Sequence, residues 1–453
     1  MSYFAWILFI GVLLVTTSMA AGVIRRGPIT SFAVYLAAGI AAGPALLGVA
    51  RLSFDHDNAD WLRSVTETGL VVSLFITGLK LRVSFRHGAW VTAARLAVPA
   101  MLLTIGGLTV LAHLVLGWSW PLALALAAIL SPTDPVLANL VSVDDARDDD
   151  ALRVALSGEA GLNDGTALPF LLLALGLMTA HTGDTDLWIR WIGIDVAWGW
   201  LAGAGLGFAV GWLVGYAGTH LRHVTKDVAP SDFLALGIMA LAYAGAELLH
   251  ASGFLAAFAA GVGLRRVEVH VAGKHSSQSE DAAADGTTNP AELLVRPNER
   301  STAGNDHPVQ TVGWVVSDAL SFGDTIERLI GALLVFVVGV AVLPVFSGTG
   351  ALVALVLFVG IRPASVWLST VGNGLPWQRR LLLGWFGIRG LGSLNYLAYA
   401  LTHGLVARNG DDLATVVLTV VALSIFVHGV TTTPLMNWRA KVLERRRQET
   451  VAT

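Results

Sequence analysis

The chain has 453 residues, of which 55% are hydrophobic and 13% are charged, and its formal net charge is −3. The charged fraction is about half that of an ordinary soluble protein, which argues against a soluble fold and indicates an all-α polytopic membrane protein. The small net charge gives no sign of nucleic-acid binding or of an acidic substrate, and the absence of cysteine excludes disulfides and thiol chemistry.

A segment of about 20 mostly apolar residues is long enough to span a bilayer as a helix. The sequence predicts about 13 such helices, at residues 3–23, 29–50, 61–79, 89–116, 120–142, 151–179, 187–218, 231–250, 252–266, 325–345, 349–371, 381–403 and 412–435. The first resembles a signal peptide. However, no Lys or Arg precedes it and Arg25 and Arg26 follow it, so we expect an uncleaved first helix.

Lys and Arg are distributed unevenly between the predicted loops. If the N-terminus lies outside, only four of them fall in outer loops, namely Arg51, Arg63, Arg190 and Arg408. Most of the others fall in the inner loops and in the C-terminal tail. Because cytoplasmic loops carry an excess of Lys and Arg, the sequence predicts a multi-pass protein of the cell membrane with its N-terminus outside and its C-terminus in the cytoplasm.

Composition divides the chain into four parts. Residues 1–266 hold helices 1–9, and residues 267–311 form a flexible cytoplasmic loop that is rich in small and polar residues and has no apolar periodicity. Residues 312–437 begin with an amphipathic segment at the inner interface, over residues 312–324, and then hold helices 10–13. Residues 438–453 are a basic cytoplasmic tail.

Two of the predicted helices are interrupted. Ser131–Val136 places two prolines around a threonine and an aspartate in the fifth helix, and Gly387–Ser393 places three glycines and an arginine in the twelfth. Their separation makes the two broken helices run in opposite directions, as in an inverted repeat of six helices preceded by one extra helix. Irregular backbone is tolerated at membrane depth only where it is buried in protein or lines a cavity. Two crossed, broken helices therefore predict a site near the midplane.

The sixth predicted helix carries polar and charged side chains in the run Ser157–Gly165. An ionisable side chain at this depth is costly unless it is paired or faces water, so it is a functional candidate. On a helix, Asn163 lies one turn beyond Glu159 on nearly the same face, whereas Asp164 points well away from Glu159. We interpret Glu159 as the ion-pair partner of an intramembrane arginine, Arg362, and Asp164 as the carboxylate that holds either a proton or a metal cation.

The ligands within reach of such a cation are hard oxygens. They are the Asp164 carboxylate, the Thr133 hydroxyl and the carbonyls that the two prolines of the first break leave without partners. This set suits Na⁺ or Li⁺ better than a transition metal. Three further residues support the site: Ser131, Asp134, which offsets the positive ends of half-helices, and Arg389, which offsets exposed carbonyls.

Ser131–Val136, Gly158–Gly165 and Gly387–Ser393 together resemble the monovalent cation:proton antiporter-1 family, the bacterial sodium/proton exchangers related to animal sodium/hydrogen exchangers. The resemblance covers nearly the whole chain. It implies an electroneutral antiporter that exchanges Na⁺ or Li⁺ for H⁺ by alternating access. It also implies a homodimer in which a six-helix core moves like an elevator against a dimerisation domain.

The resemblance also implies roles for individual residues. By similarity, Asp164 is the ion- and proton-binding carboxylate and Thr133 contributes a ligand. The family's structural Glu–Arg pair falls on Glu159 and Arg362, and Asn163 is expected to brace it.

One position departs from the pattern of several prokaryotic members. These carry a serine directly after the glutamate, where this chain has Ala160. The missing hydroxyl leaves coordination to carbonyls or water, so a K⁺/H⁺ antiporter of the same fold is the alternative.

Sequence features argue against two other classes of function, an intramembrane aspartyl protease and a gated cation channel. Asp134 and Asp164 on adjacent helices would suit an intramembrane aspartyl protease, but the Gly-x-Gly-Asp signature of such proteases is absent. A gated cation channel needs a continuous polar pore lining, whereas the predicted helices carry isolated polar groups at one depth. We expect a secondary active transporter and not an enzyme, with the cation, the proton and the lipid bilayer as partners and no resident cofactor.

Overall fold

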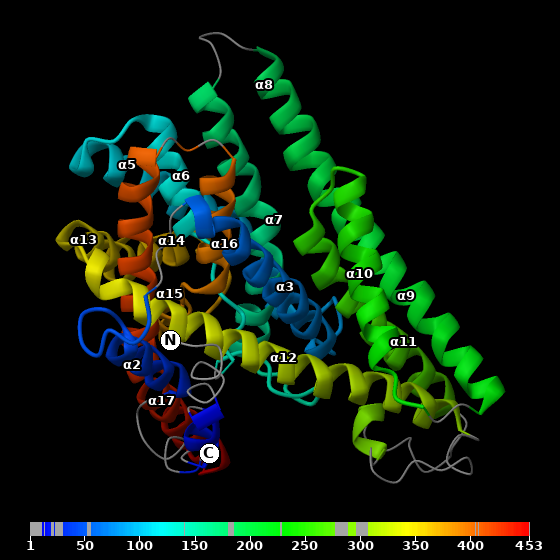
Figure 1. Cartoon of the computed structure of the whole chain (residues 1–453). Coiled ribbons are helices and arrows are strands. Elements are labelled where there is room, and N and C mark those ends of the chain that lie inside the picture. The colour runs from blue at the N-terminus through cyan, green and yellow to red at the C-terminus, as the bar shows by residue number, and fades with distance from the viewer. Residues whose placement is uncertain are drawn as a thin grey trace. The chain divides into compact units, whose positions relative to one another are not determined.

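The computed structural model describes residues 11–12, 14–19, 22, 30–51, 56–139, 141–179, 185–226, 229–276, 289–295, 307–403, 405 and 407–452. Within these residues every regular element is a helix (Figure 1). The all-α fold expected from the composition is confirmed. Of the first predicted span, the structure describes residues 11–12, 14–19 and 22.

The chain divides into two compact units. Unit 1 consists of residues 1–66, 103–141 and 330–453, and unit 2 consists of residues 67–102 and 142–329. Three helices contribute residues to both units: α3 (His56–Lys80), α5 (Met101–Leu116) and α12 (Pro308–Val345).

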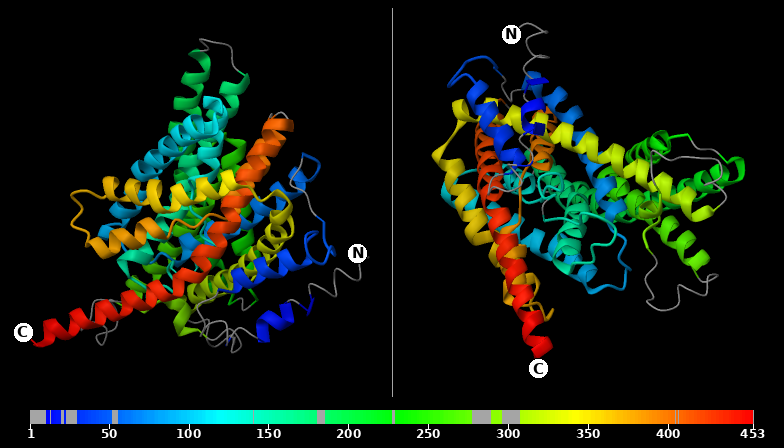
Figure 2. Two further views of the ribbon diagram at one scale, coloured as in Figure 1. Left: turned by 90° about the vertical axis from the view of Figure 1, so that its left-hand side faces the viewer. Right: turned by 90° about the horizontal axis from the view of Figure 1, so that it is seen from below.

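Unit 1 is assembled from both ends of the chain. Its further helices are α2 (Ser31–Ala42), α6 (Trp120–Leu130), α13 (Gly348–Leu355), α14 (Arg362–Ser369), α15 (Trp377–Trp385), α16 (Leu391–Thr402) and α17 (Ala407–Ala452). A π-helical segment, Val356–Ile361, joins α13 to α14. The long helix α17, which Figure 2 follows to the C-terminus, packs against α2, α6, α13 and α16 and so organises the unit.

Unit 2 is built mainly from the middle of the chain. Its further helices are α4 (Gly88–Arg95), α7 (Ala151–Thr179), α8 (Thr185–Arg190), α9 (Gly199–Thr225), α10 (Asp232–Leu248) and α11 (Gly253–Ser276). The π-helical segments Leu96–Ala100 and Trp191–Trp198 continue α4 and α8. α9 and α10 pack against α11, and α7 packs against α4 and α11. The helix α7, which carries the run Ser157–Gly165, is therefore held on two sides.

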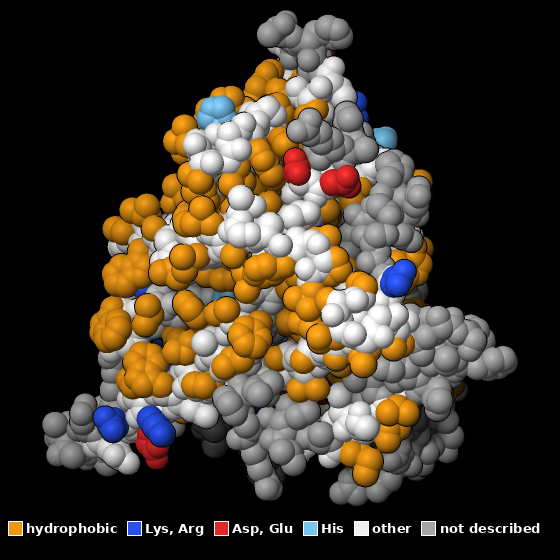
Figure 3. Space-filling model, turned by 60° about the vertical axis from the view of Figure 1, so that its left-hand side comes forward, with side chains coloured by type: hydrophobic (Ala, Val, Ile, Leu, Met, Phe, Trp, Pro, Cys, Tyr) orange, Lys and Arg blue, Asp and Glu red, His pale blue; other side chains and the backbone are white. Residues whose placement is uncertain are grey.

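Many large apolar side chains point outward. Seven helical stretches of the described residues are long and apolar enough to cross a membrane: 59–80, 88–116, 151–179, 185–225, 308–345, 348–369 and 410–445. Phe233, Leu201 and Leu248 are at least three-quarters exposed, and hydrophobic side chains are widespread on the face of the molecule shown in Figure 3. A surface of this kind is suited to contact with lipid.

Two element boundaries differ from the sequence-based ones. α12 is one continuous helix through residues 312–324, where the sequence predicts a separate interfacial segment. Asp318 lies in this stretch, and its carboxylate is buried and accepts a hydrogen bond of 2.7 Å from the Ser231 N–H. This acidic side chain of the predicted amphipathic segment therefore has a hydrogen-bond partner inside the protein. α11 continues to Ser276, nine residues past the predicted start of the cytoplasmic loop at 267.

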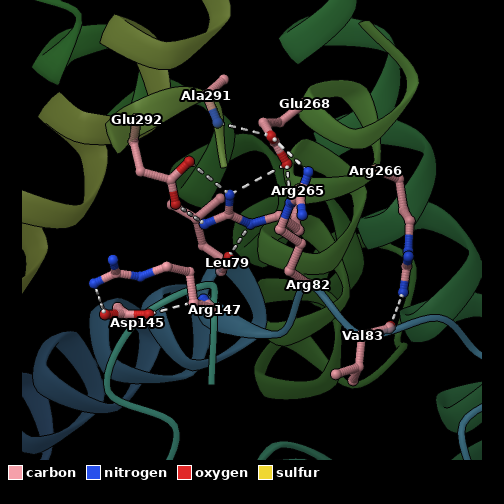
Figure 4. A network of polar contacts seen from close by, with 10 residues as sticks. All are labelled: Leu79, Arg82, Val83, Asp145, Arg147, Arg265, Arg266, Glu268, Ala291 and Glu292. Atoms are coloured by element: carbon pink, nitrogen blue, oxygen red, sulfur yellow. Dashed lines mark hydrogen bonds and ion pairs between the residues drawn. The ribbon is translucent and has the colours of Figure 1, made fainter. Parts of the chain in front are cut away.

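A buried ionic network holds one end of unit 2 together (Figure 4). The fully buried Arg265 side chain lies 3.4 Å from Glu268 and 2.9 Å from Glu292. Arg82 contacts Glu268 from another side, at 3.0 Å. Two arginines and two glutamates balance one another, so the network buries no net charge.

The same network fixes a segment of the predicted flexible loop. Glu292 belongs to a 3₁₀ turn, Ala291–Leu294. The Ala291 N–H donates to the Glu268 carboxylate at 3.0 Å, and Arg265 Nε donates to the Leu79 carbonyl of α3 at 2.5 Å. This part of the loop is therefore ordered against α3 and α11.

Candidate functional site

Both predicted helix breaks are present, and their backbones meet within unit 1. α6 ends at Leu130, and the residues that follow it form bends and turns. α15 ends at Trp385 and α16 begins only at Leu391. The Asp134 N–H donates to the Ile388 carbonyl at 2.9 Å and ties one break to the other. The fold therefore brings the two predicted breaks together. The predicted helix 120–142 is helical only to Leu130, and the described residues between Leu130 and Ala151 form bends and turns instead of a second half-helix.

The Asp134 side chain receives backbone N–H groups from both breaks. Its Oδ1 accepts from the N–H of Val136 at 2.8 Å and of Leu137 at 3.2 Å. Its Oδ2 accepts from the N–H of Leu391, the first residue of α16. The buried carboxylate thus faces the positive end of a half-helix. Thr133, directly before it, is also buried.

Arg389 donates hydrogen bonds to main-chain carbonyls at the C-terminal end of α6 and in the second break. Its fully buried guanidinium donates from Nε to the Leu130 carbonyl, the last of α6, at 2.6 Å, and from Nη1 to the Gly387 carbonyl. Ser393 Oγ donates to Ile129 O at 2.8 Å, and Ser131 Oγ donates to Ala127 O at 2.6 Å. The C-terminal carbonyls of α6 therefore receive donors from three side chains, which relieves a buried helix end.

Gly390 makes the crossing sterically feasible. A Cβ at this position would collide with the carboxylate of Asp134 and with the side chain of Leu137. Only glycine allows the backbone of the second break to approach the first so closely.

Two residues that the sequence did not single out as site residues also hold the second break. Ser424 Oγ on α17 accepts the Arg389 N–H at 2.8 Å. One turn later, His428 Nδ1 lies 3.2 Å from Ser424 Oγ, and His428 Nε2 lies 3.0 Å from the Trp385 carbonyl at the end of α15. Both ring nitrogens of the buried His428 therefore have hydrogen-bond partners. A Ser and a His one turn apart on a helix give no sign of this role until the fold is known.

In unit 2, the polar residues of α7 lie on an unbroken helix. Glu159, Asn163 and Asp164 are all buried, and Asp164 is only 1% exposed. At about 100° per residue, Asn163 lies roughly 40° from Glu159, whereas Asp164 lies roughly 140° from it. The two carboxylates therefore point to different neighbours.

Glycines fix the orientation of α7. A Cβ at Gly158 would approach Ala93 of α4 to 2.7 Å, and a Cβ at Gly161 would overlap the ring of Phe258 on α11. The glycine face is thus the contact face with α4 and α11. The side chains of Glu159 and Asn163 are directed to the other side of the helix.

Four arginines within predicted spans, Arg362, Arg389, Arg95 and Arg328, differ in exposure. Arg362 and Arg389 are buried, while Arg95 is half-buried and Arg328 is exposed. Arg328 Nε bonds the carbonyl of Asp324 in the preceding turn, at 3.0 Å. Arg362 lies in unit 1 and donates from Nη2 to the Leu383 carbonyl at 3.4 Å. Only the first two have the burial that a site residue requires.

The described residues contain no group of three or more His, Asp and Glu side chains that is placed to hold a metal ion. The candidate site therefore rests on oxygen-bearing side chains, namely Thr133 and Asp134 at the first break and Glu159 and Asp164 on α7. Of the sequence-predicted site residues, Ser131, Thr133, Asp134, Arg362 and Arg389 lie in unit 1. Glu159, Asn163 and Asp164 lie in unit 2.

The sequence is similar to a known protein family and to curated proteins. A family model described as sodium/hydrogen exchanger, transmembrane, matches residues 10–283 and 318–438. A curated Na⁺/H⁺ antiporter 2 from Zygosaccharomyces rouxii is 32% identical over 205 residues, which cover 42% of this chain and 24% of the relative. A Na⁺/H⁺ antiporter from Saccharomyces cerevisiae is 31% identical over 137 residues, which cover 29% of this chain and 14% of the relative. The aligned parts thus span about a quarter or less of these relatives' length.

The fold has a counterpart among solved structures. The sodium proton antiporter MjNhaP1 from Methanocaldococcus jannaschii superposes with a TM-score of 0.67 at 19% sequence identity. The match covers 96% of this chain and 98% of that one. At this identity, the likeness concerns the fold alone.

Proposed function

Since this chain belongs to the sodium/hydrogen exchanger family, we propose that it is a secondary active transporter that exchanges Na⁺ or Li⁺ for H⁺ across a membrane. The cation and the proton are its substrates, and it needs no resident cofactor. The curated relatives that share part of its sequence are named Na⁺/H⁺ antiporters, which supports this choice of substrates.

The observation that carries the proposal is the buried carboxylate of Asp164 beside the amide of Asn163, on an apolar helix of a family member. A carboxylate can hold a proton or a cation on the same oxygens, and the two ligands then compete. Such competition is what an exchanger requires. Thr133 supplies a hydroxyl ligand, which together with the carboxylate makes a hard-oxygen set suited to Na⁺ or Li⁺.

The remaining site residues keep fixed charges in this proposal. Glu159 pairs with Arg362, and Asn163 braces that pair, an assignment that rests on the sequence and the family resemblance. Asp134 and Arg389 hold backbone groups at the ends of the broken helices, with Ser131 in support. Their charges then stay constant during transport.

If the other charged residues of the site keep fixed charges, exchange by alternating access is electroneutral. Only Asp164 changes its occupancy, so one monovalent cation moves one way for one proton the other way, and no net charge crosses the membrane. The test is transport in proteoliposomes whose membrane potential is clamped with valinomycin at varied K⁺ gradients. Rates of Na⁺/H⁺ exchange should not depend on the potential. Rates that scale with it would mean that a second carboxylate also titrates.

The role of Asp164 is tested with Asp164→Asn, which keeps the shape of the side chain and removes its charge. We expect exchange to fall to the background of empty liposomes while the melting temperature stays close to that of the wild type. Asp318→Asn is the matched control, because Asp318 is a buried carboxylate of the same unit and the amide oxygen still accepts the Ser231 N–H. Retained exchange in Asp164→Asn would contradict the assignment.

The second candidate is a K⁺/H⁺ antiporter, and Ala160 favours it. A serine at this position would add a hydroxyl, and its absence suits a looser oxygen cage. Collapse of an imposed pH gradient, compared for Na⁺, Li⁺ and K⁺ in wild type and in Ala160→Ser, separates the two candidates. A preference for K⁺ that Ala160→Ser shifts toward Na⁺ would favour this alternative.

The proposal also places the chain in the cell membrane as a homodimer, with its N-terminus outside and its C-terminus in the cytoplasm. The unequal distribution of Lys and Arg over the loops supports this orientation. Labelling of single cysteines introduced into the naturally cysteine-free chain tests the orientation directly.

A further inference from the structure

A small pocket lies in unit 1 between the start of α15 and the last part of α17. Its volume is about 60 Å³. Arg379 contributes one wall from α15, and Trp438 and Arg439 contribute the facing wall from α17. The apolar side chains of Leu382, Val442 and Leu443 complete the lining. The pocket therefore combines two guanidinium groups with an apolar floor.

The electrostatic field at this pocket favours an anion. Arg379 lies in the first turn of α15, whose N-cap residue, Pro376, makes no side-chain capping bond, so the positive end of the helix adds to the charge of the arginine. The segments 376–382 and 436–445 carry five basic residues and one acidic residue, Glu444, which is exposed. Guanidinium groups bind phosphate oxygens in bidentate fashion.

The surroundings of the pocket indicate that the anion is attached to a lipid. Trp377 and Trp438 are both exposed, as are Leu381 and Leu443. Exposed tryptophans mark the level of lipid headgroups. A basic pocket that opens beside apolar, lipid-facing side chains matches a molecule with a charged head and a hydrocarbon tail.

We propose that this pocket binds the headgroup phosphate of an anionic phospholipid. Arg379 and Arg439 contact the phosphate, and the glycerol and upper acyl chain lie on Leu382, Val442 and Leu443. The site is independent of the proposed exchange activity, because none of its residues lies in a helix break or in α7. It links the first half of a broken helix, α15, to α17, so an occupied pocket stabilises unit 1.

The test compares the full-length protein in zwitterionic nanodiscs with and without phosphatidylglycerol. In the wild type, we expect the melting temperature to rise with the phosphatidylglycerol fraction. The double variant Arg379→Gln with Arg439→Gln should lose most of this rise, since removing two basic contacts weakens binding of an anionic headgroup roughly 30-fold. Lys441→Gln is the control, because it removes a charge from the same helix outside the pocket lining.

Several results would overturn the proposal. One is an unchanged lipid-dependent rise in the double variant, and another is an equal loss in Lys441→Gln. A third is an equal rise produced by inorganic phosphate alone in zwitterionic nanodiscs, which would show a site for a soluble anion. A second measurement needs no variant: phosphatidylglycerol with a photoreactive acyl chain should label wild-type peptides that contain Leu382 or Leu443. Absence of label from both peptides contradicts the proposal even if the double variant does not fold.

Discussion

The two units bury ionised side chains in different ways. In unit 2, Arg82 and Arg265 face Glu268 and Glu292, so opposite charges compensate one another. In unit 1, the Asp134 carboxylate accepts from main-chain N–H groups, and the Arg389 guanidinium donates to main-chain carbonyls, at the two helix breaks. The ion-pair network of unit 2 requires several charged side chains to be present together. The arrangement in unit 1 requires a helix to be interrupted next to the charged side chain, so that main-chain groups are available to it.

This difference gives the breaks a structural purpose. A continuous helix uses its own N–H and carbonyl groups and offers none to a neighbouring charge. An interrupted helix has free main-chain groups at the break, and here they surround a buried carboxylate and a buried guanidinium. The crossing can therefore hold two fixed charges that do not depend on each other.

The largest effect is expected from Glu268→Gln. The substitution leaves Arg82 and Arg265 facing a single carboxylate, and breaking a buried ion pair in this way costs about 3–5 kcal/mol of stability. Adding Arg265→Gln should recover part of the loss, because the charges balance again. Thermal unfolding of the two single variants and the double variant in detergent measures the coupling. Glu444→Gln, at an exposed position, serves as the control, and strictly additive losses would show that the network is not coupled.

Asp134→Asn and Arg389→Gln should each cost about 1.5–3 kcal/mol, the usual contribution of hydrogen bonds to a charged group. Here the double variant should not recover stability, since each side chain is held by backbone and not by the other. We expect additivity within about 0.5 kcal/mol. A clear recovery in the double variant would mean that the two charges form a pair and that the contrast between the units is wrong.

Gly390→Ala should cost about 1–3 kcal/mol, as overpacking of a buried contact does. The added methyl group would force apart the backbone of the second break and the Asp134 carboxylate. Gly360→Ala is a matched control in the same unit, because a Cβ there meets no neighbouring atom within 4 Å. Equal melting temperatures for the two variants would show that the breaks are not in close contact.

The smallest effect is expected for an exposed ion pair in the loop before α7. Arg147 lies 3.0 Å from Asp145, and the hydrogen bond from its guanidinium lowers the pKa of the Asp145 carboxyl below its ordinary value. A lowered pKa stabilises the fold above the ordinary value of 3.8, and the effect is lost as the pH falls through the folded-state pKa. Arg147→Gln should therefore leave the melting temperature at pH 7 unchanged within error, since exposed pairs contribute little. A large fall at pH 7 would contradict this ranking.

Local sequence patterns were sufficient to predict the helical class, both helix breaks and the burial of the polar run on α7. Two prolines within four residues, or three glycines within six, disfavour a continuous helix whatever its neighbours are. The charged and amide side chains of Glu159, Asn163 and Asp164 on an apolar helix are costly to expose to lipid, so their burial in protein is expected. The hydrogen-bond partners could not be predicted in the same way. Ser393 with Ile129, or Glu268 with Ala291, are far apart in sequence, and no periodicity connects them.

The burial of individual charged side chains also could not be predicted from the sequence. Arg265 stands at the end of the predicted helix 252–266, next to the predicted cytoplasmic loop, yet its side chain is fully buried. Asp318, in the predicted amphipathic segment 312–324, is buried as well. In both cases the decisive partner, Glu292 for Arg265 and the Ser231 N–H for Asp318, comes from another part of the chain.

The use of main-chain groups at the crossing determines which positions can vary. Leu130, Ile388 and Leu391 serve the site through their carbonyl or N–H groups, which every residue except proline provides in full. Their side chains are therefore replaceable by other apolar residues without loss of a partner for Asp134 or Arg389. A saturation library scored for transport should tolerate Val, Ile or Met at these three positions and reject nearly every substitution at Asp134, Arg389 and Gly390.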